Sequence, residues 1–266
     1  MSRPRLVATD LDGTIVGSDG EISQRTVAAL TAVQGLGVPV VFVTGRPPRW
    51  MAQVAERTGH TGVAVCANGA LVYDLRTEEV VDIFPIAIEV GLEVARRLRA
   101  AIPEVAFAVE TGEGFSHERS YVARWDTGQA KVVDDLERIY DQPAVKLLVR
   151  HEGLGPDDLL AAAREVAGDL VELTHSSSTG LLEISAAGVS KASALALLAE
   201  RHGVPAADVV AFGDMPNDLP MLAWAGRAYG VRTGHPEVLA AVEQLVDGPD
   251  EDGVARELER LFALSS

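Results

Sequence analysis

Two aspartates near the N-terminus stand two positions apart in the segment Asp10-Leu-Asp-Gly-Thr14. An apolar stretch precedes them, and we expect it to form a buried strand that ends at Asp10. Because alternate residues of an extended chain point the same way, Asp10 and Asp12 can present two carboxylates to one site, while Gly13 permits a sharp turn. Two close carboxylates repel each other unless a cation lies beside them. The segment therefore predicts a charged site, whereas a single Asp-Gly pair would predict only a turn.

A second polar cluster, Thr44-Gly45-Arg46, directly follows another valine-rich stretch. A hydroxyl and backbone amides at the junction between a loop and a helix are good ligands for an anion, because the start of a helix carries partial positive charge. Lys191 follows a predicted helix cap, Ser190, and could add an ammonium group to the same sheet edge. Alone, the Thr44-Gly45-Arg46 cluster is a weak signal. Lys191 alone is weak as well, since a lysine early in a helix is more often simply solvated.

The segment Gly213-Asp-Met-Pro-Asn-Asp218 follows a further apolar stretch. Asp214, Asn217 and Asp218 bring three oxygen-bearing side chains together, which suits a hard cation such as Mg²⁺. The alternative is an acidic helix start, in which Asp214 caps the helix and Asp218 is solvated. Four polar clusters after predicted strands or at helix starts favour one common site over four independent accidents.

Strands and helices alternate at both ends of the chain, which predicts an α/β fold: a doubly wound, mostly parallel sheet with helices on both faces. In such sheets ligands bind at the carboxyl ends of the strands, where the polar clusters lie. The expected strands are 5–9, 38–43, 209–212 and 228–231, and the expected helices are 23–36, 47–57, 190–202, 216 onward and 251–262.

The middle of the chain has amphipathic helices and short strands in another order. We predict helices at 88–100 and 156–167, with strands at 105–109, 145–150, 171–174 and 181–185. Runs of strands with few intervening helices indicate an inserted α+β cap domain at 86–188, and the core domain then consists of 1–85 and 189–266.

Composition limits the class of protein. With 47% hydrophobic residues and apolar stretches far below the roughly 20 residues that span a bilayer, we expect a globular, cytoplasmic protein without membrane segments. The net charge of −16 argues against nucleic acid as a partner. The single cysteine, Cys66, is predicted to be a small buried residue without a catalytic role. Five histidines lack metal-ligand spacing and are predicted to be solvated: His60, His117, His151, His202 and His235.

Taken together, these segments resemble the haloacid dehalogenase-like phosphatase superfamily, specifically its type IIB, Cof-like branch with a large cap. The resemblance covers essentially the whole chain. It rests on Asp10–Thr14, Thr44–Arg46, Asn68-Gly-Ala70, Gly188-Val-Ser-Lys191, Gly213–Asp218 and Glu251-Asp-Gly-Val-Ala255. The first and fifth of these are highly specific.

The resemblance implies Mg²⁺-dependent hydrolysis of phosphate monoesters of small metabolites, such as sugar phosphates, through an aspartyl phosphate. Asp10 would be the nucleophile, and Asp12 would protonate the leaving oxygen and later help to deprotonate water. The residues implied to bind phosphate are Leu11, Thr44, Gly45, Lys191 and Asn217. The metal would be held by Asp10, the backbone carbonyl of Asp12 and Asp214, with Asp218 in the outer shell.

The inserted cap would read the leaving group of the substrate. Within it, His175 lies in a polar loop that is either a substrate contact or a mobile surface turn, and Glu183 is expected to be exposed on one sheet face, where it could meet substrate hydroxyls. For Arg46 three alternatives stay open: a substrate contact, a pair with an acidic neighbour, or a surface position.

Other functions share part of this pattern. A phosphotransferase or phosphomutase would use the same aspartyl phosphate but exclude water. A phosphorylated signalling domain also combines acidic residues, a hydroxyl and a lysine, but it needs neither a second carboxylate two positions after the acceptor nor a hundred-residue insertion. A non-catalytic sugar-phosphate binding protein has no need of a nucleophile such as Asp10.

Overall fold

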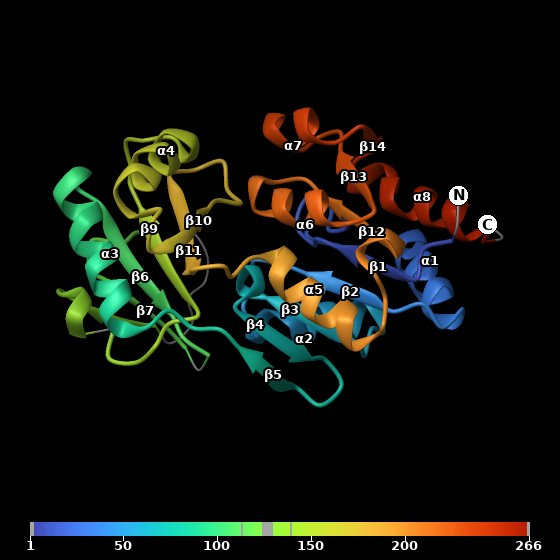
Figure 1. Cartoon of the computed structure of the whole chain (residues 1–266), viewed down its shortest axis with the longest axis horizontal. Helices are drawn as coiled ribbons and strands as arrows, with labels where there is room; N and C mark the ends of the chain where they lie inside the picture. The colour runs from blue at the N-terminus through green and yellow to red at the C-terminus, as the bar shows by residue number, and fades with distance from the viewer. Residues whose placement is uncertain (1–2, 113, 124–129, 139, 265–266) are drawn as a thin grey trace. The chain divides into compact units, whose positions relative to one another are not determined.

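The computed structural model describes residues 3–112, 114–123, 130–138 and 140–264. The chain forms two compact units, a core unit of Met1–Asp82 with Ser190–Ser266 and a cap unit of Ile83–Val189. The core unit contains both ends of the chain, and the cap unit is one continuous insertion (Figure 1). The predicted site residues of the four polar clusters all belong to the core unit.

The core unit is built on an eight-stranded sheet with the order β14-β13-β12-β1-β2-β3-β4-β5. β1 is fully buried and pairs in parallel with β12 and β2, which explains its continuous apolar sequence. The pairs from β14 through to β3 are all parallel, and β4 is antiparallel to β3. The strands are β1 (Leu6–Thr9), β2 (Val40–Val43), β3 (Val63–Cys66), β4 (Leu71–Asp74), β5 (Glu79–Ile83), β12 (Val209–Gly213), β13 (Arg227–Val231) and β14 (Gln244–Val246).

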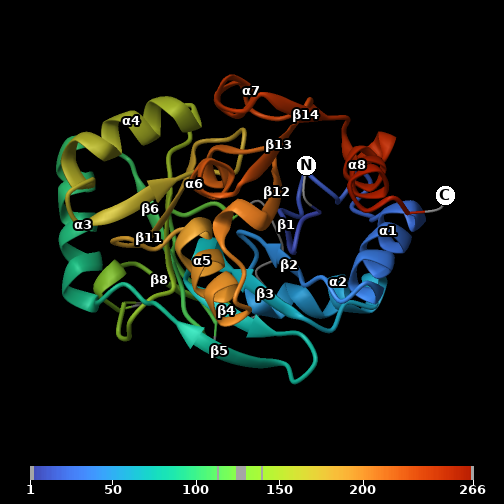
Figure 2. The same ribbon diagram turned by 45° about the vertical axis from the view of Figure 1, so that its right-hand side comes forward.

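Helices cover both faces of this sheet. In Figures 1 and 2, α1, α2 and α8 lie on one side of the strands, and α5 and α6 lie on the other. Ser23 begins α1 by accepting a hydrogen bond from the backbone N–H of Thr26, and a reciprocal capping box of Ser190 and Ser193 begins α5. The helices are α1 (Gln24–Gly35), α2 (Met51–Thr58), α5 (Lys191–Arg201), α6 (Leu219–Trp224), α7 (Pro236–Ala241) and α8 (Gly253–Phe262).

The cap unit is a six-stranded sheet with the order β10-β11-β9-β6-β7-β8, antiparallel except for the β7–β8 pair. Alternate residues such as Phe107, Leu147 and Ile184 share one apolar core with residues of the two helices. The elements are α3 (Ile88–Ala101), β6 (Ala106–Glu110), β7 (Phe115–Glu118), β8 (Lys131–Val133), β9 (Lys146–Arg150), α4 (Pro156–Ala167), β10 (Val171–Thr174) and β11 (Leu181–Ala186).

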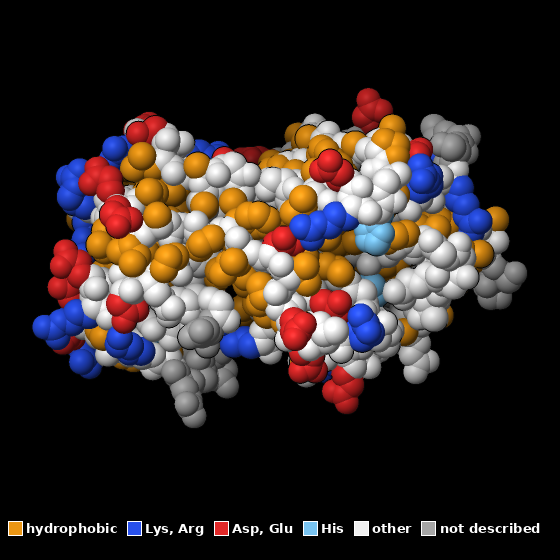
Figure 3. Space-filling view, turned by 60° about the horizontal axis from the view of Figure 1, so that its bottom comes forward, with side chains coloured by type: hydrophobic (Ala, Val, Ile, Leu, Met, Phe, Trp, Pro, Cys, Tyr) orange, Lys and Arg blue, Asp and Glu red, His pale blue; other side chains and the backbone are white. Residues whose placement is uncertain are grey.

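The predicted fold class is therefore confirmed, with a mainly parallel core sheet and a separate inserted sheet. The short strands β3, β4, β5, β7, β8 and β14 and the helix α7 were not predicted. Among the described residues, no helix is both long enough and apolar enough to cross a membrane. On the face drawn in Figure 3, basic side chains are scattered among acidic ones rather than gathered into a stripe.

One of the histidines differs from its prediction. His60 is 3% exposed, packs its ring 4.4 Å from that of Phe42 and lies with Nδ1 2.6 Å from Nε2 of Gln34. Burial lowers the pKa of His60 to about 4, so the ring is neutral near pH 7. The prediction that His60 is solvated was wrong, because the apolar packing that buries it comes from residues distant in sequence.

Candidate active site

Asp10 continues the line of β1, with its backbone N–H donating to the carbonyl of Phe212 at 3.0 Å, and its side chain is 5% exposed. The turn that follows needs glycine at position 13, where φ is +80°. A Cβ on Gly13 would lie 2.4 Å from Oδ2 of Asp214. The turn after β1 therefore packs directly against the segment that follows β12. Thr14 strengthens this contact, since its hydroxyl donates to Oδ1 of Asp214 at 3.0 Å.

Lys191 lies at the centre of the acidic residues. It is the first residue of α5, and its side chain is fully buried. Its Nζ donates to Oδ1 of Asp10 and to Oδ1 of Asp218, each at 2.6 Å. One ammonium group therefore joins residues that are 181 and 27 positions away in the sequence.

The turn after β12 fixes Asp218 in place. Oδ2 of Asp218 accepts hydrogen bonds from the backbone N–H groups of Asp214 and Met215, both at 3.0 Å. A Cβ on Gly213 would lie 2.6 Å from that of Asp218, so the side chain folds back tightly over the end of the strand. Because both of its oxygens are already engaged, Asp218 supports the site through Lys191 and the backbone.

Three buried carboxylates surround this single ammonium group. Ligand oxygens of Asp10, Asp214 and Asp218 lie within 4.8 Å of one another. Burial raises the pKa of Asp10 well above its usual value although Lys191 opposes the shift, and the charges of Asp218, Asp214 and Asp12 raise it further. Burial and the charge of Asp218 raise the pKa of Asp214 to about 7, against the hydrogen bond from Thr14. Burial alone would lower the pKa of Lys191, but Asp10 and Asp218 outweigh it and raise that pKa.

This excess of negative charge fits a divalent cation. Carboxylate oxygens are the ligands that hard cations prefer, and a cation beside them removes the repulsion that raises their pKa values. Asp10 and Asp214 are the acidic side chains whose oxygens are best placed to hold it, because those of Asp218 are engaged elsewhere. The donor set is thus suited to Mg²⁺ rather than to a metal that prefers nitrogen or sulfur.

Thr44 and Arg46 follow β2 and lie in the same unit. Thr44 is fully buried, and its Oγ1 accepts a hydrogen bond from the backbone N–H of Arg46 at 3.0 Å. The guanidinium of Arg46 forms a two-point ion pair with Asp12, with Nε 2.8 Å from Oδ2 and Nη2 2.5 Å from Oδ1. Of the three alternatives for Arg46, the structure thus has the pair with an acidic neighbour. Asp12 remains 59% exposed in this pair, whereas Asp10 is buried.

Leu11, Gly45 and Asn217 occupy the loops between these groups. Leu11 is fully buried, and its carbonyl accepts from the N–H groups of the next turn. Asn217 is 6% exposed, and its Nδ2 donates to Oδ1 of Asn68 at 3.1 Å. All the side chains predicted to bind phosphate or metal therefore lie in the core unit, on loops that follow β1, β2 and β12 or at the start of α5.

Two further residues of this region had no predicted role. Thr14 and Asn68 were noted only as parts of segments that carry the family resemblance, yet Thr14 binds Asp214 and Asn68 binds Asn217. A short polar residue beside a glycine in a loop after a buried strand was the only available signal.

In the cap unit, the prediction that Glu183 is exposed was wrong. Glu183 is 5% exposed and forms an ion pair with Lys146, which belongs to the neighbouring strand β9. Its second oxygen accepts from the hydroxyl of Ser176 at 2.6 Å. A buried charge requires such partners. The pairing of β11 with β9 supplies Lys146, and the loop between β10 and β11 supplies Ser176.

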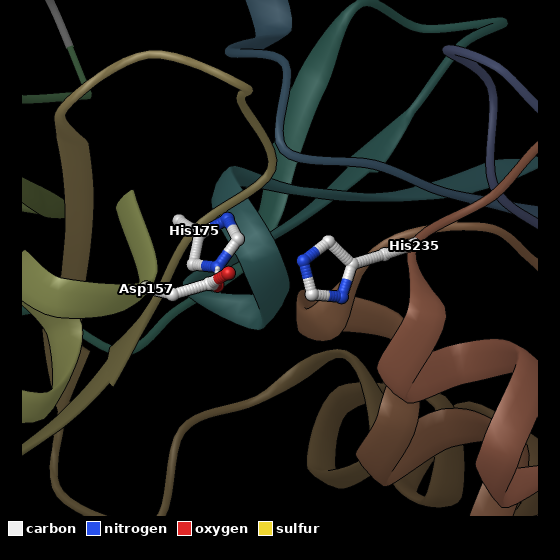
Figure 4. Close-up of side chains that lie close together, drawn as sticks. All are labelled: Asp157, His175 and His235. Atoms are coloured by element: carbon white, nitrogen blue, oxygen red, sulfur yellow. Dashed lines mark hydrogen bonds and ion pairs between the residues drawn. The ribbon is translucent and has the colours of Figure 1, made fainter. Parts of the chain in front are cut away.

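His175 is also buried, at 1% exposure, so it does not belong to a surface turn. Its Nε2 lies 2.8 Å from Oδ1 of Asp157 at the start of α4, as Figure 4 shows. His235, which is labelled in the same figure, belongs to the core unit, where its ring accepts from the backbone N–H of Glu237 and begins α7.

Comparisons with known proteins assign the chain to a family. The model of the haloacid dehalogenase-like hydrolases matches residues 7–258, so the chain belongs to that family. It is 26% identical to the 5-amino-6-(5-phospho-D-ribitylamino)uracil phosphatase YitU of Bacillus subtilis over 99% of both chains, and 27% identical to a phosphoglycolate phosphatase of Methanopyrus kandleri over 97% of both. The predicted class, a phosphatase of this family, is confirmed.

The fold is also that of solved structures. The chain superposes on the subclass IIB sugar phosphatase BT4131 with a TM-score of 0.83, covering 98% of this chain and 100% of the other at 18% identity. At this identity the likeness concerns the fold. The chain therefore has the same fold as a solved structure of the type IIB branch.

The raised pKa of Asp214 predicts how the stability of the metal-free protein depends on pH. Between the usual pKa of 3.8 and about 7, the folded state keeps a proton on Asp214 that the unfolded chain has lost. The free energy of unfolding therefore falls as the pH rises through this window, by up to about 1.4 kcal/mol per pH unit from this group. Asp214→Asn removes this contribution.

The measurement is the urea midpoint at pH 4 to 7 in the presence of a chelator. The midpoint of wild type is expected to fall more steeply with pH than that of Asp214→Asn, and Asp19→Asn, which changes an exposed carboxylate, should behave as wild type. Parallel pH profiles for wild type and Asp214→Asn would contradict the assignment.

Proposed function

We propose that this protein is a Mg²⁺-dependent phosphatase of small phosphorylated metabolites that forms an aspartyl phosphate on Asp10. One observation carries the proposal: the buried ammonium of Lys191 lies 2.6 Å from both Asp10 and Asp218, with Asp214 in the same group of carboxylates. A buried nucleophile beside a fixed cation suits attack on an anion, which a carboxylate in water would repel.

The residues then divide the reaction into two transfers. In the first, a carboxylate oxygen of Asp10 forms a bond to phosphorus while the bond from phosphorus to the leaving oxygen breaks, and Asp12 gives that oxygen a proton. In the second, Asp12 takes a proton from a water molecule, whose oxygen bonds to phosphorus and releases phosphate from Asp10. The exposure of Asp12 agrees with this role, since a group that exchanges protons with the leaving group and water must reach them.

Fixed positive charge stabilises the phosphoryl group during both transfers. Lys191 and the hydroxyl of Thr44 are proposed to contact its oxygens, together with the backbone amides of Leu11 and Gly45 and the side chain of Asn217. Mg²⁺, held by Asp10, the carbonyl of Asp12 and Asp214, supplies neutralising charge at the same oxygens when it is bound.

The substrate is proposed to be a small phosphate monoester, such as a sugar phosphate. This rests on the phosphoribityl and phosphoglycolate compounds in the names of the relatives and on the inserted cap as the part that reads the leaving group. Glu183 and His175 are proposed to affect this choice through the cap sheet. A phosphotransferase would instead pass the phosphoryl group to an alcohol. Release of inorganic phosphate is therefore the measurement that distinguishes hydrolysis from transfer.

Asp10→Asn is expected to abolish turnover of every phosphate ester, because an amide cannot form the aspartyl phosphate. Chelation should have the same effect on wild type, and Ca²⁺ should restore little activity, because the larger ion relaxes the near-octahedral geometry that Mg²⁺ imposes. Release of inorganic phosphate from a panel of metabolite esters is the measurement, with Asp19→Asn as the matched control that should retain activity. Turnover by Asp10→Asn, or by wild type stripped of divalent ions, would refute the proposal.

Asp12→Asn should slow the enzyme according to how much the leaving oxygen needs a proton. A general acid contributes about 10²- to 10⁴-fold, so an alkyl or sugar phosphate should suffer a loss of that order, whereas a nitrophenyl phosphate, whose leaving group is a stable anion, should suffer much less. Single-turnover kinetics isolates the first transfer from the second, in which Asp12 acts again.

Arg46→Gln provides the control for Asp12→Asn, because it breaks the ion pair with Asp12 but leaves the carboxylate of Asp12 in place. If Asp12 only holds the loop through Arg46, both variants should slow the two substrates by equal factors. Equal slowing of both substrates by Asp12→Asn would therefore exclude proton donation by Asp12.

A further inference from the structure

A short turn after β3 has an unusual backbone. Ala67, Asn68 and Gly69 all have positive φ, at 50°, 58° and 105°. Only glycine adopts such angles freely, and asparagine tolerates them better than most residues. Consecutive left-handed residues persist where the surrounding structure holds them, and they are concentrated at functional sites.

The turn is held by the loops of the candidate active site. The backbone N–H of Asn68 donates to the carbonyl of Thr44, and that of Ala67 donates to the carbonyl of Arg46, both at 3.0 Å. On its other side, a Cβ on Gly69 would lie 2.1 Å from the carbonyl oxygen of Ser190, next to Lys191. The turn thus joins the Thr44 loop to the start of α5.

The side chain of Asn68 reaches a third part of the site. Asn217, between Asp214 and Asp218, donates from Nδ2 to Oδ1 of Asn68 at 3.1 Å, and the two side chains are 6% and 3% exposed. Among the described residues, Nδ2 of Asn68 and Oδ1 of Asn217 have no hydrogen-bond partner.

Because an NH₂ group carries two N–H bonds, the pair of carboxamides has the NH₂ group of Asn68, the second N–H group of Asn217 and the carbonyl of Asn217 to spare. The same kinds of group remain spare whichever side chain donates, because the nitrogen and oxygen of an amide exchange places when the group is turned over. Buried polar atoms are rarely left unmatched, since they have lost their hydrogen bonds to water. The spare atoms point to a ligand that supplies an acceptor for an N–H group and to water for the carbonyl.

We propose that Asn68 is a positioning residue, which holds the carboxamide of Asn217 so that the pair donates an N–H hydrogen bond to an oxygen of the bound phosphoryl group. This rests on the proposed function, since that group must lie among Thr44, Lys191 and Asp10. A cation is a poor partner for an amide N–H, whereas a phosphoryl oxygen is a good acceptor. Asn68 acts on this oxygen through Asn217, at the junction of three loops.

The alternative is that Asn68 serves only to accept left-handed backbone angles. Asn68→Gly separates the two, because glycine keeps the backbone conformation and removes the carboxamide. Asn68→Asp keeps the size of the side chain and can still accept from Asn217, but it brings a negative charge toward the phosphoryl group.

The experiment measures hydrolysis of p-nitrophenyl phosphate and inhibition by orthovanadate, an oxyanion that imitates the transferring phosphoryl group, with Mg²⁺ present. We expect Asn68→Gly to keep a thermal midpoint within a few degrees of wild type, while kcat/KM and the affinity for vanadate each fall about tenfold. Asn68→Asp should weaken vanadate binding more than Asn68→Gly. Asn217→Ala should match Asn68→Gly, and the double variant should be no worse than Asn217→Ala alone, because one residue acts through the other.

The inference would be overturned if Asn68→Gly kept wild-type kinetics and vanadate affinity. It would also be overturned if the loss in the double variant equalled the product of the losses in the two single variants. If Asn68→Gly fails to fold, Asn68→Asp decides, since unchanged vanadate affinity there would also overturn it. These outcomes concern only Asn68 as long as wild type hydrolyses the ester. A wild-type protein that neither hydrolyses esters nor binds vanadate would refute the proposed function and this inference with it.

Discussion

The contact of one buried ammonium group with two buried carboxylates is the interaction on which the site depends. Removing Lys191 from water is costly, and the cost is offset only because Asp10 and Asp218 accept from it at 2.6 Å. Three carboxylates around one lysine still leave excess negative charge, which a divalent cation would neutralise. The overall acidity of the chain is thus compatible with an anionic substrate, because the positive charge is local.

This electrostatic arrangement imposes tight backbone geometry on the loops around it. Gly13 allows the first loop to meet Asp214 where any side chain would collide, and Gly69 allows the turn after β3 to meet Ser190. Both glycines have positive φ. The parallel strands β1, β2 and β12 bring these loops to one edge of the sheet, so the fold supplies proximity and the glycines supply close approach.

Much of this could be predicted from local patterns. Buried parallel strands are continuous apolar runs, so β1, β2 and β12 were recognised, and polar residues directly after them indicated the site. Short edge strands escaped prediction, since β5 mixes exposed valine and isoleucine with acidic residues and lacks a regular alternation. Long-range partners escaped as well: Asn68 and Asn217 are 149 positions apart, and no local signal links Glu183 to Lys146. These pairs depend on the register of the sheets and on the paths of loops.

The most direct test of this account is to locate the phosphoryl group during the first turnover. Enzyme in excess over a phosphate ester would be quenched in acid within milliseconds to seconds, and its peptides analysed by mass spectrometry. The account predicts an added phosphoryl group on the peptide that contains Asp10, and its loss in Asp10→Asn. Phosphorylation of another residue, or product formation with no phosphorylated peptide at any time, would contradict it.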